Sequence, residues 1–372
     1  MTILLNASQL KMAGGLNVSL NIIKNFCEIL NNNKYIIICP NIEEYRALKY
    51  LNLVKIYIPE KYDSFEYKFF LGVWLKKKIE EVNPTVVFNL CNTPLKVKYK
   101  QLTMLHWPYA VYPESKVWEM MTLKDKLIRK FKLYKFKKNI NQHSVFTVQT
   151  DVMKNRLVKL YKLKNVFVVP NSINIEYATN SIDSPSSLLQ KDNSYKYFLY
   201  PTKYYPHKNI EILIDVAKEI VKNKNKFIII LTLNEKDKRV KKIINEINSL
   251  KLSNVIINVG YLNFKEIHSV YNSVDAILMP TILETLGLPY LEAISLKKPL
   301  FTSDLDFSRS LCGDYGIFFN PFSYVDIYEK MKLIQNNDVI SKKITFAESV
   351  MERYTGDWSE VVKLYNTILK TL

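Results

Sequence analysis

The chain has 372 residues, of which 48% are hydrophobic and 24% are charged, as in an ordinary folded soluble protein. Its length suggests two domains, which can bury large cores without disulfides or metals. The four cysteines lie far apart and form no CxxC pair, which argues against a structural zinc site and favours a reducing compartment.

The formal net charge of +18 is compatible with nucleic acid, anionic lipid or phosphorylated ligands as partners. Lysine is abundant throughout the chain, so a compositional bias explains this charge equally well. The N-terminal sequence predicts no signal peptide, and no apolar run approaches the ~20 residues that cross a bilayer. We therefore expect a cytoplasmic protein that does not span a membrane.

The predicted elements alternate between short apolar runs and helix-like segments. The runs cover residues 3–6, 35–39, 85–90, 145–149 and 166–170, then 196–200, 227–233, 255–260, 276–280 and 299–303. Near-continuous apolar runs suit parallel strands that are covered on both faces. The alternation of strand and helix predicts two doubly wound α/β domains, whose ligand is expected in a cleft at the carboxyl ends of the strands.

A polar segment divides the chain. Residues 176–193 are rich in Ser, Asn and Asp and predict an interdomain linker. The N-terminal domain is then expected over residues 1–175 and the C-terminal domain over residues 194–356. Residues 357–372 have the spacing of an amphipathic helix.

Two features of the first domain could contact a ligand. Gly14 and Gly15 follow the first strand, at a helix start where backbone can approach a ligand closely. The full G-x-G-x-x-G fingerprint is absent, so dinucleotide binding is poorly supported. His106 ends an apolar strand before an aromatic loop, and by itself it fits a core or capping histidine better than a site residue.

The most basic segment is 123–139, which carries eight Lys or Arg and one acidic residue. Leu123, Leu127, Phe131 and Tyr134 recur at helical spacing and would share one face. Two interpretations are equally open: this face packs against its own domain, or the helix rests on anionic lipid headgroups.

The second domain opens on a strand followed by "TKYYPHKN", in which Lys203 and Lys208 occupy a strand-to-helix turn. Two ammonium groups there could neutralise a pyrophosphate, each acting as a point charge. In a chain this rich in lysine, two turn lysines alone are weak support for such a site.

The segment "ETLGLPYLEA" holds two glutamates at positions 284 and 292. Glu284 belongs to a loop after a buried strand, Pro289 suits the first turn of a helix, and Glu292 lies about one turn into that helix. Three backbone amides at the helix start lie between the carboxylates, those of Leu286, Gly287 and Leu288. Amides there bind anions, and carboxylates accept hydrogen bonds from sugar hydroxyls. A helix-capping Glu292 and a solvated Glu284 are the alternative, which spacing alone favours.

The pair Asp304 and Asp306 has a spacing that can hold a divalent metal, although such a metal would also need a substrate diphosphate within reach. A polar loop is the favoured interpretation. The sequence contains no nucleophile elbow, Walker loop or zinc cluster.

Taken in order, the Gly-Gly loop, His106, the "PHKN" turn and the E-x7-E pair of Glu284 and Glu292 resemble the retaining glycosyltransferases of the GT-B fold, family 4. The run P-T-x-x-E-T-L-G-L-P-x-L-E-A, the following "KKP" and residues 303–327 match the usual pattern of that family. This resemblance covers most of the chain. It implies two Rossmann-like domains with parallel sheets facing across a cleft, and a C-terminal helix that returns to the N-terminal, acceptor-side domain.

The resemblance also implies roles for the candidate residues. Glu292 would accept hydrogen bonds from the donor ribose, and Glu284 from the transferred sugar. Lys203 and Lys208 would hold the diphosphate. The other implied contacts are backbone at Gly14 and Gly15 to the diphosphate, the amides of Leu286, Gly287 and Leu288 to sugar and phosphate, Tyr261 to the base, and His106 to the donor sugar.

Three positions depart from the family pattern. Thr202 and Lys203 stand where Gly-Arg is usual, which keeps a charge but loses the planar fork of arginine. Ser172 stands where a glycine is common.

The implied activity is transfer of a sugar from a UDP- or GDP-linked donor to a hydroxyl of a glycan or lipid-linked acceptor, in bacterial surface polysaccharide assembly. His106, Glu284, Lys203 and Lys208 would be catalytic, with no metal and no cofactor. Peripheral contact with anionic membrane through 123–139 would place the protein at the inner face of the cytoplasmic membrane.

Alternatives are a nucleotide-sugar epimerase or phosphorylase of the same fold, and a non-catalytic membrane- or nucleic-acid-binding protein. The sequence shows neither a proton-transfer carboxylate pair nor a nucleic-acid reading module, and we expect no nucleic-acid partner.

Overall fold

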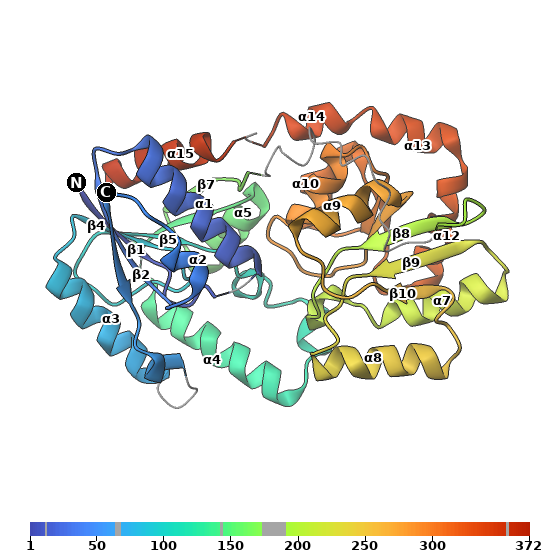
Figure 1. Ribbon diagram of the computed structural model, residues 1–372, viewed down its shortest axis with the longest axis horizontal. Coiled ribbons are helices and arrows are strands. Elements are labelled where there is room, and N and C mark those ends of the chain that lie inside the picture. The colour runs from blue at the N-terminus through green and yellow to red at the C-terminus, as the bar shows by residue number, and fades with distance from the viewer. Residues whose placement is uncertain (12, 64–67, 142–143, 173–190, 355–356) are drawn as a thin grey trace. The chain divides into compact units, whose positions relative to one another are not determined.

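The computed structural model describes residues 1–11, 13–63, 68–141, 144–172, 191–354 and 357–372. The chain divides into two compact units (Figure 1). Unit 1 comprises Met1–Pro113, Leu123–Ser172 and Thr355–Leu372, and unit 2 comprises Glu114–Thr122 and Ile173–Tyr354. The predicted linker at 176–193 lies outside the described residues, apart from its last three positions.

Unit 1 contains a seven-stranded parallel sheet with the order β3-β2-β1-β4-β5-β6-β7. The strands are β1 Thr2–Asn6, β2 Lys34–Cys39, β3 Leu53–Tyr57, β4 Val86–Asn89, β5 Gln101–Met104, β6 Val145–Val148 and β7 Asn165–Val168. The helices are α1 Ala13–Ile29, α2 Glu43–Arg46, α3 Lys68–Val82, α4 Leu123–Asn139, α5 Asp151–Tyr161 and α15 Trp358–Thr371.

Both faces of the unit 1 sheet are covered, as the unbroken apolar runs predict. Residues of β1, β2 and β4 on one face share a buried cluster with α1 and α15, while residues of the same strands on the other face pack against α3 (Figure 1). Tyr365 of α15 is fully buried, and its ring centroid lies 4.8 Å from that of Phe88 on β4. The return of the C-terminal helix to the N-terminal unit is therefore confirmed.

Unit 2 contains a six-stranded parallel sheet with the order β10-β9-β8-β11-β12-β13. The strands are β8 Lys196–Tyr200, β9 Phe227–Leu231, β10 Ile256–Asn258, β11 Ala276–Met279, β12 Leu300–Ser303 and β13 Ile317–Phe319. The helices are α7 Ile212–Lys222, α8 Lys238–Ser249, α9 Phe264–Ser273, α10 Leu288–Ser295, α11 Asp306–Cys312, α12 Tyr324–Met331, α13 Asn337–Ile344 and α14 Ala347–Met351.

Two doubly wound, Rossmann-like units with parallel sheets confirm the predicted fold class. In each sheet the chain order reverses once, between β1 and β4 in unit 1 and between β8 and β11 in unit 2. In the part of the chain that the structure describes, no helix has the length and apolar character needed to cross a bilayer.

Candidate functional site

The best-defined group of candidate residues lies at the reversal point of the unit 2 sheet. Open α/β sheets bind ligands outside the carboxyl ends of their strands at such a point. After β8 the chain passes through the one-turn 3-10 helix Pro206–Lys208, and after β11 it passes through the loop of Glu284 into α10. Because β8 and β11 are hydrogen-bonded neighbours, both connections emerge at the same place.

Lys208 and Glu284 form an ion pair between these two connections. The side chains are only 14% and 12% exposed, respectively. Both charges are therefore largely withdrawn from water, and each depends on the other for compensation. The pairing brings together two candidate residues that lie 76 positions apart in the sequence.

Hydrogen bonds hold the two connections in place beneath this ion pair. The hydroxyl of Tyr200 donates to the backbone oxygen of Lys208 at 2.8 Å, and the amide of Ile282 donates to the backbone oxygen of His207 at 2.9 Å. Asn209 follows with a φ of 55°, a left-handed conformation that asparagine tolerates better than most residues. Its side-chain amide donates to the Pro321 oxygen at 2.7 Å. Lys208 thus projects from a rigid turn.

Gly287 shapes the start of α10 beside this ion pair. It has a φ of +70° and is followed by Leu288 and Pro289 in the first turn of the helix. An added Cβ would lie 2.7 Å from Cδ2 of the buried Tyr290 and 3.7 Å from the Glu284 carboxyl carbon. Amides in a first helical turn have no partner within the helix and attract anions. The predicted amide group therefore stands next to the Lys208–Glu284 pair.

Replacing Gly287 by alanine is expected to destabilise the protein by about 2–4 kcal/mol, because a left-handed backbone and a clash with Tyr290 add together. Chemical denaturation followed by circular dichroism measures this change. Gly72→Ala in α3 is the control, since a Cβ there meets nothing within 4 Å and helix propensity predicts a gain of up to about 1 kcal/mol. Equal effects of the two substitutions would contradict the assigned role of Gly287.

Glu292 lies in α10, where the hydroxyl of Tyr271 donates to its carboxylate at 2.8 Å. The side chain keeps a partly exposed surface, yet burial of the carboxyl group raises its pKa from an ordinary 4.5 to about 7. The hydrogen bond from Tyr271 opposes this rise. A carboxylate that titrates near neutrality inside a loop–helix site is typical of a functional group.

Lys203 and Tyr261 form a second group in unit 2. The Lys203 ammonium lies 5.2 Å from the centroid of the Tyr261 ring, and that side chain is 61% exposed. Lys203 follows β8, and Tyr261 follows β10, two strands away in the same sheet. An exposed aromatic ring beside a cation offers a stacking surface for a planar base and a positive charge for a phosphate.

The remaining candidates lie in unit 1. Gly14 and Gly15 stand in the first turn of α1, and a Cβ at Gly14 would meet nothing within 4 Å. The backbone amide of His106 donates to the Asn92 side chain at 2.6 Å. Burial lowers the pKa of the His106 imidazole to about 4, so the ring is neutral at pH 7. These residues belong to a different unit from the Lys208–Glu284 pair.

Two supporting residues were not singled out by sequence reasoning. Asn209 fixes the lysine turn, and an asparagine before a helix was a recognisable signal for a left-handed turn residue. Tyr271 contacts Glu292 from α9, but a tyrosine within an apolar helix cannot be distinguished from an ordinary core residue in a single sequence.

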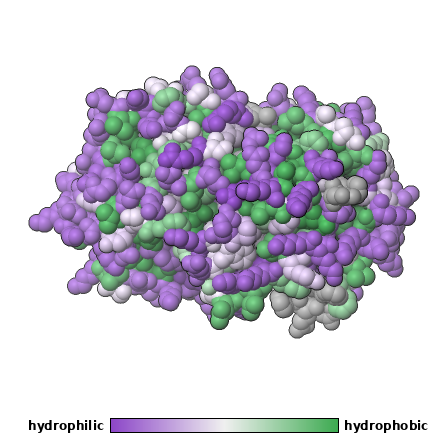
Figure 2. All heavy atoms as spheres, turned by 180° about the vertical axis from the view of Figure 1, so that it is seen from behind, coloured by the Kyte–Doolittle hydropathy of each residue, from purple (hydrophilic) through white to green (hydrophobic). Residues whose placement is uncertain are grey.

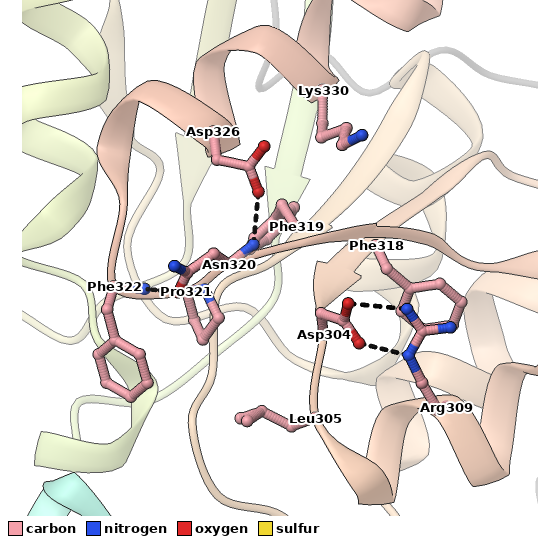
Figure 3. A pocket seen from close by; sticks show the side chains of 10 residues that line it. All are labelled: Asp304, Leu305, Arg309, Phe318, Phe319, Asn320, Pro321, Phe322, Asp326 and Lys330. Atoms are coloured by element: carbon pink, nitrogen blue, oxygen red, sulfur yellow. Dashed lines mark hydrogen bonds and ion pairs between the residues drawn. The ribbon is translucent and has the colours of Figure 1, made fainter.

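Of the two residues Asp304 and Asp306, Asp304 has an ion-pair partner in the structure, which accounts for an acidic residue at that position. Both oxygens of Asp304 bond the Arg309 guanidinium, which lowers the pKa of that carboxyl (Figure 3). A pocket of about 450 Å³ adjoins this pair, and it is lined by Asp304, Leu305, Arg309, Phe318, Phe319, Asn320, Pro321, Phe322, Asp326 and Lys330. It contains none of the predicted site residues. Among the described residues, no cluster of three or more potential metal ligands occurs.

Comparisons with known proteins agree with this architecture. Residues 186–347 match the family model described as glycosyl transferases group 1. The chain is 24% identical over 221 residues to the O-antigen chain mannosyltransferase RfbU of Salmonella typhimurium, an alignment that spans 58% of each protein.

Two solved structures resemble the whole chain. A glycosyltransferase from Rickettsia africae superimposes with a TM-score of 0.71 at 16% identity, covering 100% of this chain and 98% of that one. Anabaena HepE in complex with UDP-glucose superimposes with a TM-score of 0.73 at 15% identity over 100% of both chains. The chain therefore has the GT-B fold, and its residues 186–347 are similar to the glycosyl transferases group 1 model.

Proposed function

We propose that this protein transfers a sugar from a nucleotide diphosphate sugar to a hydroxyl group of an acceptor, with retention of anomeric configuration. The observation that carries the proposal is the Lys208–Glu284 pair next to the start of α10, at the reversal point of the unit 2 sheet. A cation, a carboxylate and first-turn amides converge there, which are the groups that a sugar diphosphate requires. The glycosyl transferases group 1 match covers this same region.

Donor binding would redistribute the charges of the site. In the structure the Lys208 ammonium pairs with the Glu284 carboxylate. When the donor binds, this ammonium would pair with the donor diphosphate instead. The Glu284 oxygens would then accept hydrogen bonds from hydroxyls of the transferred sugar. Glu292 would accept those of the ribose, and Tyr261 would stack on the base, with Lys203 near the diphosphate.

In the reaction, the bond between the anomeric carbon and the diphosphate oxygen breaks while the acceptor oxygen bonds the same face of that carbon. The acceptor proton passes to a phosphate oxygen of the leaving group. Lys203, Lys208 and the α10 amides stabilise the negative charge that builds on the diphosphate, so fixed positive charge supplies the catalysis without a metal or cofactor. Neutral His106 would offer the donor sugar one donor and one acceptor.

The acceptor that we propose is a hydroxyl of a glycan or a lipid-linked glycan, in bacterial surface polysaccharide assembly in the cytoplasm. The support is the partial similarity to an O-antigen chain mannosyltransferase. The two units would provide an acceptor side in unit 1 and a donor side in unit 2.

A screen of UDP- and GDP-linked sugars by thermal shift tests the donor assignment, because a ligand that binds only the folded state raises the melting temperature. The stabilising donor is then incubated with acceptor glycans, and the anomeric configuration of the product is read by proton NMR. Retention is expected. An epimerase would instead isomerise the nucleotide sugar with no acceptor present, and stabilisation by no nucleotide sugar would overturn the proposal.

A further inference from the structure

Helix α4 packs against unit 1 through one side only. Phe136 is fully buried there, with ring centroids 5.8 Å from Phe146 and 5.5 Å from Tyr161. On the same side, the Lys132 ammonium lies 4.4 Å from the centroid of the Trp107 ring. These contacts join α4 to the sheet, to α5 and to the segment that follows β5.

The opposite side of α4 presents an apolar ridge to solvent. The ridge consists of Leu123, Leu127, Phe131 and Tyr134, which are 81%, 67%, 57% and 58% exposed, respectively. Helical spacing left open whether this face packs on its own domain, and the structure shows that it does not. Figure 2 shows the face of the molecule seen from behind Figure 1, on which hydrophilic side chains predominate and hydrophobic ones are interspersed.

Lysines border this apolar ridge on both sides. At about 100° per helical residue, Lys124 falls along one flank and Lys130 and Lys137 fall along the other, while Lys138 lies at the C-terminal end of the ridge itself. All four are exposed. The single acidic residue of the helix, Asp125, pairs with Arg129 at 3.3 Å on the inner side. The outer face of α4 therefore combines apolar side chains with positive charge and contains no acidic group.

We propose that the outer face of α4 docks unit 1 onto an anionic lipid bilayer. The ridge of Leu123, Leu127, Phe131 and Tyr134 enters the boundary between headgroups and acyl chains, and the flanking lysines contact the anionic headgroups. Nucleic acid would satisfy the lysines but would leave the apolar ridge in water. A bilayer accommodates both features, which is why the geometry favours lipid over nucleic acid.

Docking by α4 has a consequence for the site. The Lys132–Trp107 and Arg129–Tyr109 stacks, the latter at 5.1 Å, tie the docking helix to the segment next to His106. A bilayer bound by α4 would thus lie close to the carboxyl edge of the unit 1 sheet, where a lipid-linked acceptor would present its hydroxyl. This consequence rests on the proposed function, whereas docking itself does not.

Vesicle sedimentation of the full chain tests the proposal. Vesicles of phosphatidylcholine containing about one-third phosphatidylglycerol should bind the protein, and phosphatidylcholine alone should bind it at least about tenfold more weakly, with added salt reducing the difference. The variant L127Q/F131Q should lower binding at least about tenfold by removing apolar contact. The variant K130Q/K137Q should lower it and weaken its salt dependence.

Matched controls lie on unit 2. Val221→Gln on α7 replaces a side chain that is 47% exposed, and K241Q/K242Q on α8 removes two lysines, and neither should change vesicle binding. Binding of UDP and GDP should be unchanged in the α4 variants, which separates failure of docking from failure of the donor site. Equal binding to both vesicle types, insensitivity to L127Q/F131Q, or binding to DNA with none to vesicles would each overturn the proposal.

Discussion

Replacing Lys208 by methionine is expected to lower kcat/KM for the nucleotide sugar by about 10²–10³, the usual effect of removing one charge-stabilising donor from a transition state. Lys208 projects from a turn that is fixed by the Tyr200 hydroxyl and the Ile282 amide. Its ammonium therefore needs little reorganisation to meet a leaving diphosphate. Methionine keeps most of the side-chain volume and removes only the charge.

The same substitution leaves the Glu284 carboxylate mostly buried without its partner, so the folded state is expected to lose up to about 3 kcal/mol. Circular dichroism establishes that the variant is folded before its kinetics are measured. Lys208→Arg should recover part of the rate because it restores the charge, and Lys218→Met on the exposed face of α7 should leave the rate unchanged. A folded Lys208→Met variant with full activity would remove Lys208 from the proposed catalytic group.

Replacing Glu292 by glutamine is expected to stabilise the protein above neutral pH. The carboxyl group has a pKa of about 7 when folded and an ordinary value of 4.5. Between these values the unfolded chain releases a proton that the folded protein keeps, so stability falls as pH rises from 4.5 to 7. The neutral amide removes this dependence, and the gain at about pH 8 should be on the order of 2–3 kcal/mol.

Urea denaturation of both proteins at several pH values measures this difference. It should be largest at about pH 8 and should approach zero near pH 4, where the carboxyl group is protonated in both states. The Tyr271 hydroxyl can still donate to the oxygen of the new side-chain amide, so that contact is preserved in the comparison. A constant difference at all pH values would show that Glu292 does not titrate near neutrality. Such a gain in stability would show that the ionised Glu292 carboxylate destabilises the folded protein above neutral pH.

The fold could be predicted from the sequence because buried parallel strands have a recognisable pattern. β2 reads "KYIIIC" and is buried from its second residue onward, as both-face coverage of a parallel strand requires. β3 was not predicted because it lies at the edge of the sheet, is only partly buried, and interrupts its apolar residues with Lys55. An unbroken apolar run therefore decided which strands could be recognised, because the edge strand β7 was predicted although only one of its four residues is buried.

The candidate residues could be named from the sequence, but the contacts among them could not be predicted from it. The contact of Lys208 with Glu284 depends on β8 and β11 being neighbours in the sheet, which local spacing does not encode. The neutral state of His106 and the raised pKa of Glu292 depend on burial by distant segments. In α4 the helical spacing was correct, but spacing alone could not show which face is turned to solvent.

The central claim is that the loop and helix of Glu284 and Glu292 hold the nucleotide portion of a sugar donor. Calorimetric titration of UDP and GDP into the wild-type chain and into Glu292→Ala tests it most directly, with Glu219→Ala on α7 as the control. We predict that the wild type binds one of these nucleotides, that Glu292→Ala binds it at least about tenfold more weakly, about 1.4 kcal/mol, and that Glu219→Ala is unchanged. Equal affinity of the wild type and Glu292→Ala for both nucleotides, or binding of neither by the wild type, would contradict it.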